Sequence, residues 1–152
     1  MRLYIFFLVF LLAVLSGSQV DSQDSCMGNP KNKIRGCDRH GCGHYGARRK
    51  GGKHLGLDIE CKDGATVKAP FDVTLNGKAI PYNNKSPIDN GINLRGKGLC
   101  FKLFYVKPDS YYGIVRKGQR IGTMLPMQRV YPGITSHVHV QMCDKSDPTK
   151  YF

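Results

Sequence analysis

Short apolar runs alternate with turn-forming residues along most of the chain after residue 54. Apolar and polar side chains alternate at 57–61, and further strand-like segments lie at 66–69, 73–75, 91–95, 99–106 and 137–142. Residues 117–122 predict another turn followed by a short strand. A two-residue period is typical of strands, and Asn76-Gly77 and Gly96-Lys97-Gly98 are typical of turns that join neighbouring strands. Residues 80–90, which are rich in Pro and Asn, predict a long loop.

This pattern predicts an all-β fold. The 18 Gly and 8 Pro interrupt every segment that would be long enough for a bundle helix. Many short strands with close turns favour a small, antiparallel, partly barrel-like sheet with long loops. The 152 residues suit a single domain, which we place at 19–152.

The N-terminus has the pattern of a secretory signal peptide. Met1 and Arg2 precede thirteen apolar residues at 3–15, and the small residues Ser16, Gly17 and Ser18 follow. A membrane-spanning helix needs about 20 apolar residues, so this run is too short to span. We therefore expect cleavage after residues 1–18 and a secreted, extracellular protein with no membrane span.

The chain is strongly basic, with 23 Lys and Arg against 11 Asp and Glu and a net charge of +12. Such a charge attracts polyanions, for example glycosaminoglycans or acidic cell surfaces, and secretion argues against nucleic acid as a partner. A solvated surface without a specific ligand is the alternative interpretation. The densest group of cations, and the candidate polyanion site, is Arg48, Arg49, Lys50 and Lys53, preceded by Lys31, Lys33 and Arg35.

Six cysteines, at positions 26, 37, 42, 61, 100 and 143, follow the predicted signal peptide. An even number in a secreted chain predicts three disulfides, although the count leaves the pairing open. A local bridge between Cys37 and Cys42 is geometrically easy because glycines lie around them. A zinc finger made by these two cysteines with His40 and His44 is the weaker alternative in an oxidising compartment.

Two histidine patterns predict a metal site. His54 and Asp58 lie four residues apart at the entry to a predicted strand, with Gly56 leaving space between them, and His137 and His139 lie two apart on another. Even spacing places side chains on one face of a strand. If the two strands are neighbours, imidazole and carboxylate groups that suit Zn²⁺ converge. Separate surface histidines are the alternative interpretation.

Four segments resemble, in this order, the lysostaphin-type zinc metallopeptidase family over residues 54–142: HLGLD at 54–58, GATVKAP at 64–70, VRKGQRIG at 115–122 and SHVHV at 136–140. The resemblance implies the metallopeptidase fold, with Zn²⁺ held by His54, Asp58 and His139. It also implies that His137 matches a residue that assists catalysis beside the metal.

The chain departs from this family at one catalytic position. Active members carry a further His in a Tyr-x-His-Leu step, whereas residues 104–108 here read FYVKP, with Lys107 at or near the His position. A Lys stays protonated at neutral pH and cannot accept a proton as imidazole does. The resemblance therefore implies a structural zinc site on a catalytically impaired fold, where His137 is vestigial.

Three further segments resemble the secreted vertebrate members of this family: CDRHGCG at 37–43, YPGI at 131–134 and SDPT at 146–149. That resemblance implies the disulfides Cys26–Cys61, Cys37–Cys42 and Cys100–Cys143. It also implies a cytokine-like, chemotactic signalling protein that binds leukocyte or other cell-surface receptors. The alternatives are an active zinc metalloendopeptidase that cleaves glycyl bonds of bacterial cell walls, and a cationic host-defence protein.

Overall fold

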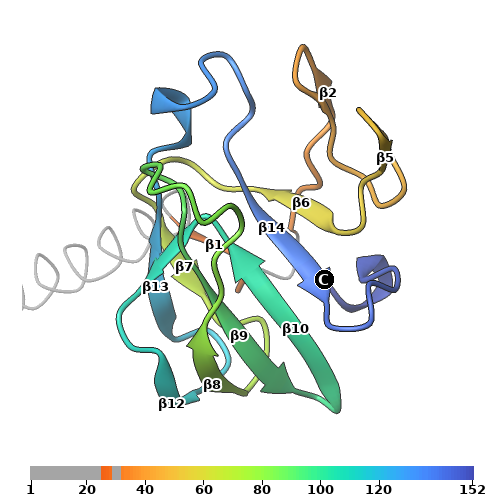
Figure 1. The fold of residues 1–152 in the computed structure, drawn as a ribbon. Coiled ribbons are helices and arrows are strands. Elements are labelled where there is room, and N and C mark those ends of the chain that lie inside the picture. Colours follow the sequence, from red (N-terminus) through yellow and green to blue (C-terminus); the bar gives the residue numbers. More distant parts are fainter. Residues whose placement is uncertain (1–24, 29–31) are drawn as a thin grey trace, which may run out of the picture.

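Two sheets and two small hairpins make up the computed structural model, which describes residues 25–28 and 32–152 (Figure 1). The predicted signal peptide at 1–18 lies outside the described residues. The expected all-β class is confirmed, since the helices within the described residues are single turns: η1 (Met127–Arg129) and η2 (Thr149–Tyr151). In this part of the chain no helix has the length and apolar character needed to cross a membrane.

The larger sheet is antiparallel throughout and has six strands. In spatial order these are β12 (Tyr112–Val115), β8 (Val73–Lys78), β9 (Gly91–Gly96), β10 (Leu99–Phe104), β14 (His137–Met142) and β6 (Leu57–Glu60). Strand β14 thus lies between β10 and β6, although β6 comes far earlier in the chain. This pairing brings the two predicted histidine segments together.

The smaller sheet has four strands, in the order β1 (Ser25–Cys26), β7 (Thr66–Lys68), β13 (Arg120–Met124) and β11 (Val106–Pro108). Strand β1 runs parallel to β7, and the other pairs are antiparallel. Over the described residues neither sheet closes into a barrel. The hairpins β2–β3 (Cys37–Asp38 and Gly41–Cys42) and β4–β5 (Arg48–Arg49 and Gly52–Lys53) stand away from both sheets (Figure 1).

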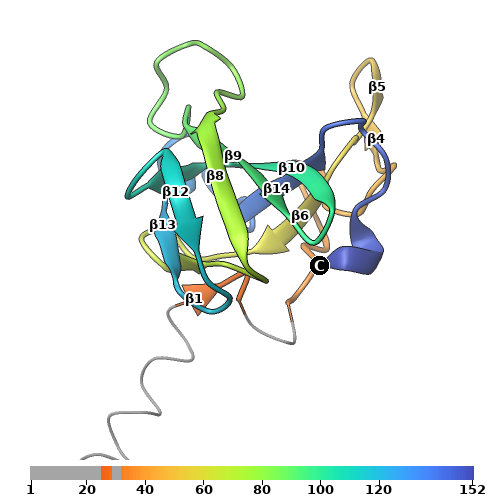
Figure 2. The ribbon, with the colours of Figure 1, turned by 90° about the horizontal axis from the view of Figure 1, so that it is seen from below.

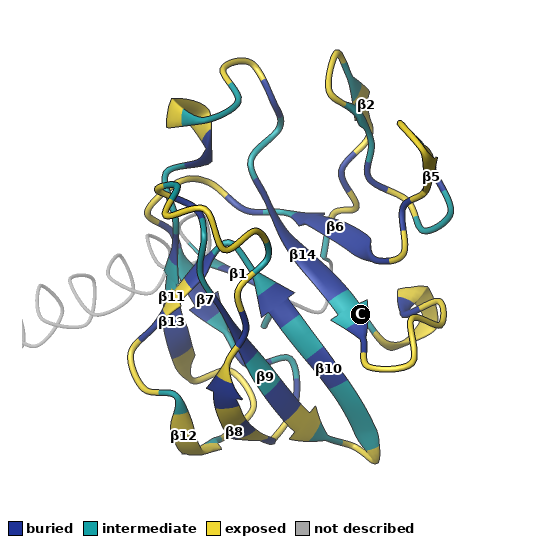
Figure 3. Ribbon diagram, in the orientation of Figure 1, coloured by how far each residue is buried: buried dark blue, intermediate teal, exposed yellow. Residues whose placement is uncertain are grey.

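Side chains from both sheets form one hydrophobic core. The two-residue period is clearest in β8, where Val73 and Leu75 are buried while Thr74 and Asn76 are exposed. Five of the six residues of β14 are buried, so both of its faces are covered (Figure 3). The largest fully buried side chains include Phe101, Leu57, Ile59, Ile92, Leu94, Leu103 and Ile121.

Two predicted details of the strands are wrong. The chain does not turn at Asn76-Gly77, because β8 continues to Lys78 and the irregularity is a shift of register between Leu75 and Lys78. Gly77 has φ of 96°, a conformation that allows such a bulge. The predicted strand at 99–106 is also divided into β10 and β11 at Tyr105, whose φ is 71°.

Three disulfides connect these elements, in the pairing that the family resemblance implies. Cys26–Cys61 joins β1 to the end of β6, and Cys100–Cys143 joins β10 to the end of β14. Cys37–Cys42 closes the β2–β3 hairpin, where the two residues are directly opposite. The described residues contain no free cysteine.

The loop lengths predict unequal contributions to stability. Replacing Cys100 and Cys143 together by Ala opens a 43-residue loop and should lower the free energy of unfolding by about 4 kcal/mol in the loop-entropy model. The same change at Cys37 and Cys42 opens a five-residue separation and should cost about 2 kcal/mol. Urea unfolding of the two double variants measures both losses of unfolding free energy. Losses of equal size would contradict the prediction.

Candidate metal centre

The pairing of β6 with β14 places two of the expected ligands side by side. His139 is directly opposite Asp58, and Val138 opposite Ile59. His54 precedes β6 instead of lying on it, and its backbone pairs with Ala47 through an N–H···O bond of 2.8 Å. Its imidazole therefore approaches the cluster from the side of the β4–β5 hairpin. The two-residue period of a strand does not explain its position.

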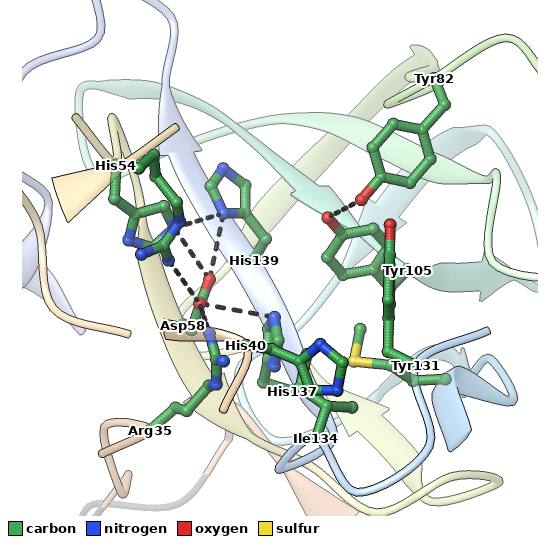
Figure 4. Close-up of a pocket in the computed structure, with 12 residues that line it drawn as sticks. Arg35, His40, His54, Asp58, Tyr82, Tyr105, Tyr131, Ile134, His137 and His139 are labelled. Carbon is green, nitrogen blue, oxygen red and sulfur yellow. Dashed lines mark hydrogen bonds and ion pairs between the residues drawn. The ribbon is translucent and has the colours of Figure 1, made fainter. Parts of the chain in front are cut away.

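The three side chains converge closely (Figure 4). His54 Nε2 is 3.0 Å from His139 Nδ1, and each of these nitrogens is 3.1 Å from Oδ1 of Asp58. Ligand atoms that lie about 2.0–2.1 Å from a tetrahedral metal are about 3.3 Å from one another. The triangle of donor atoms therefore has nearly the size that a metal ion requires.

Hydrogen bonds on the outer side of each ring determine which nitrogen faces the cluster. His54 Nδ1 lies 3.0 Å from the His44 carbonyl, and His139 Nε2 lies 3.0 Å from Oε1 of Gln141. Because both partners are acceptors, the outer nitrogens can carry the protons, which would leave the inward nitrogen of each ring free to bind a cation. In that tautomer the two inward nitrogens and the Asp58 carboxylate are three converging acceptors, an arrangement that a cation stabilises. The donor set therefore fits a divalent metal ion.

Two glycines let the backbone approach these ligands. A Cβ atom at Gly56 would collide with the ring of His139 and with the Val140 carbonyl. A Cβ atom at Gly43 would lie 2.6 Å from Cβ of Arg35 and 3.0 Å from Cβ of Asp58. The space that the sequence predicts at Gly56 is thus filled by His139 itself.

The second oxygen of Asp58 is held by a buried arginine. Arg35 is only 3% exposed; its Nη1 donates to Asp58 Oδ2 at 3.0 Å, and its Nε and Nη2 donate to Asp38. Burial raises the pKa of Asp58, but the hydrogen bonds with His139 and His54 outweigh burial and hold that pKa well below its usual range. Arg35 is therefore a buried counter-ion of Asp58, although its place beside other cations in the sequence predicted a basic surface residue.

His137 lies beside the three potential ligands. Its Nε2 is 3.4 Å from Asp58 Oδ2, and its Nδ1 donates to the Thr135 carbonyl at 2.7 Å. Burial lowers the pKa of His137, so the ring is mainly neutral at pH 7. It presents a lone pair towards the pocket above the cluster.

This pocket has a volume of about 280 Å³ and an aromatic side that the sequence did not reveal. Tyr82, Tyr105 and Tyr131 line it together with Met127 and Ile134. The hydroxyl groups of Tyr82 and Tyr105 are 2.7 Å apart, and Figure 4 shows them on the side away from His54. Burial raises the pKa of Tyr105 to about 12. No local pattern could have found these tyrosines, because they come from three separate segments.

The remaining predicted site residues are divided between the pocket and the surface. Lys107 is exposed on β11, opposite Thr123, and does not line the pocket. Arg48, Lys50 and Lys53 are exposed on the β4–β5 hairpin. Arg49 turns inward, with Nη2 3.7 Å from Asp58 Oδ2.

No protein-family model matches the chain. It is 52% identical over 126 residues to leukocyte cell-derived chemotaxin-2 of Bos taurus and 51% identical to that of Mus musculus; each alignment covers 83% of both chains. It is also 55% identical over 127 residues to myeloid protein 1 of Gallus gallus, which covers 82% of this chain but 39% of that protein. The chain therefore belongs to the leukocyte cell-derived chemotaxin-2 family.

Proposed function

We propose that the protein is a secreted, cytokine-like signal that attracts leukocytes by binding receptors on their surface. The observation that carries this proposal is the similarity to two proteins named leukocyte cell-derived chemotaxin-2, which extends over most of both chains. The three disulfides agree with it, since such bonds persist in an oxidising extracellular compartment.

We propose further that His54, Asp58 and His139 hold a structural Zn²⁺ ion on a lysostaphin-type metallopeptidase fold. Support comes from the three donor atoms within 3.1 Å of one another and from the outer hydrogen bonds that orient both rings. When bound, zinc would supply folding free energy, because an unfolded chain does not offer the assembled site. Cu²⁺ suits the same ligands, so metal analysis has to identify the ion.

Loss of peptidase activity is part of this proposal. Lys107, at or near the position of the family's further His, is exposed outside the pocket. The aromatic ring nearest to His137 on that side belongs to Tyr105, at 5.7 Å between centroids. A hydroxyl whose pKa is about 12 stays protonated at neutral pH and is a poor general base.

A second proposal concerns Arg48, Lys50 and Lys53, which we call the hairpin cations. They are exposed on the β4–β5 hairpin, which stands away from the body of the protein (Figure 1), and the whole chain has a net charge of +12. An accessible group of like charges attracts anionic polymers. We propose that glycosaminoglycans bind here and hold the signal near cell surfaces.

The signalling proposal predicts directed migration. Leukocytes should move into a chamber that contains the purified, disulfide-bonded protein and should not move when the protein is at equal concentration on both sides. Reduced and alkylated protein is the control, because it lacks the folded receptor-binding surface. Equal migration in the gradient and at uniform concentration would contradict the proposal.

The metal proposal predicts about one zinc ion per chain by elemental analysis of the native protein. At a free zinc concentration of about 1,000 times Kd the ion adds about 4 kcal/mol of stability. A strong chelator should therefore lower Tm by roughly 10 °C. His139→Ala and Asp58→Asn should abolish binding, whereas His44→Ala should retain it, because the side chain of His44 is exposed.

Hydrolysis of a pentaglycine peptide by the same zinc-loaded sample separates the structural site from the enzymatic alternative. We expect no turnover above that of the His139→Ala variant. Turnover by the native protein that Asp58→Asn abolishes would instead establish a metalloendopeptidase.

The hairpin cations predict specific retention on heparin. Replacing Arg48, Lys50 and Lys53 together by Gln should lower the eluting salt concentration by roughly 0.1 M or more. A variant with Gln at the exposed residues Lys62, Lys117 and Lys150 loses the same charge and should shift less. Equal shifts would show that retention follows net charge alone, as expected for a cationic host-defence protein.

A further inference from the structure

Arg49 differs from its sequence neighbours in where its guanidinium lies. Its Nη2 donates to the Cys42 carbonyl at 2.6 Å, and its Nη1 donates to the Arg48 carbonyl at 3.2 Å. These contacts hold the group at the wall of the pocket, where its side chain is 28% exposed. A guanidinium has more N–H groups than these two carbonyls use, so Arg49 can also donate to a ligand in the pocket.

The charges of the arginine and aspartate side chains at the pocket cancel one another when no metal ion is bound. Arg35 and Arg49 carry two positive charges, and Asp38 and Asp58 carry two negative charges. No Lys or Glu lines the pocket among the described residues. A divalent ion would therefore leave two positive charges uncompensated in a partly enclosed space, which favours an anionic ligand.

The opposite wall favours a ligand that is also apolar. Tyr82, Tyr105 and Tyr131 present aromatic surfaces, and Ile134 and Met127 contribute apolar ones. Figure 4 shows these tyrosines across the pocket from His54 and His139. Pockets that combine such walls with a few polar groups bind small organic ligands in a defined orientation.

We infer that this pocket binds the carboxylate of a ligand with a neighbouring apolar or aromatic group, and that Arg49 is the residue that recognises the carboxylate. The inference rests on the proposed metal site, which supplies the excess positive charge. A carboxylate accepts hydrogen bonds from a guanidinium with good geometry. The C-terminal residue of a peptide and a free aromatic acid both have this chemistry.

The test uses the full-length mature protein loaded with Co²⁺, whose visible spectrum reports metal coordination without any enzymatic activity. Isothermal titration calorimetry measures binding of N-acetylphenylalanine and of its amide, which differ only in the carboxylate. We expect the acid to bind at least about tenfold more tightly, because a hydrogen bond to a charged group contributes about 1.5–3 kcal/mol. N-acetyl-Gly-Gly-Phe distinguishes the two sources: tighter binding than N-acetylphenylalanine supports a peptide ligand, and equal binding supports a free aromatic acid.

Arg49→Gln should weaken binding of the acid about tenfold and leave the cobalt spectrum of the free protein unchanged. Arg48→Gln is the matched control and should have no effect, because its side chain lies outside the pocket. Equal binding of acid and amide, or equal affinities of the two variants, would overturn the inference while the cobalt spectrum still supports the metal centre. A native protein that takes up no Co²⁺ would refute the metal centre itself.

Discussion

A carboxylate removed from water is the constraint on which this site depends. Asp58 is 1% exposed, and its carboxylate is surrounded by Arg35, Arg49 and three imidazoles. A buried charge without partners costs several kcal/mol, so the segments that supply these partners must all be in place. Arg35 precedes β2, His54 follows β5, and the other two imidazoles lie on β14. Asp58 thereby connects parts of the chain that are far apart in sequence.

The polar segment that precedes β6 consequently has a structural role. Asp38 binds Arg35 and also accepts the backbone N–H of Thr135, so the β2–β3 hairpin connects the buried arginine to the segment before β14. The Cys37–Cys42 disulfide closes this hairpin, and Cys26–Cys61 connects β1 to the end of β6. Figure 2 shows the β4–β5 hairpin and the loop after β8 extending from the sheets, and residues from both line the pocket.

The proposed glycosaminoglycan site and the proposed pocket use different surfaces of one scaffold. In the proposed metal centre, the ligands are oriented by carbonyl groups and by Arg35, which is suited to stability. Around it, the pocket has tyrosines and Arg49, which are suited to binding an organic anion. The hairpin cations lie outside this pocket, so glycosaminoglycan binding and ligand binding can vary independently.

The sequence by itself determined the all-β class, because strand periodicity and turn residues act locally, and it placed Asp58 and His139 on strands that turn out to be neighbours. The pairing of the cysteines followed from resemblance and not from their count. Only the tertiary structure decided that Arg35 is buried and that Tyr105 lines the pocket. It also decided that Arg49 lies at the pocket wall while its neighbour Arg48 lies outside the pocket. The alternation of polar and apolar residues reports which face of its own segment a side chain occupies. Whether a cation meets solvent or a buried carboxylate depends on a segment elsewhere in the chain, and that contact exists only after folding.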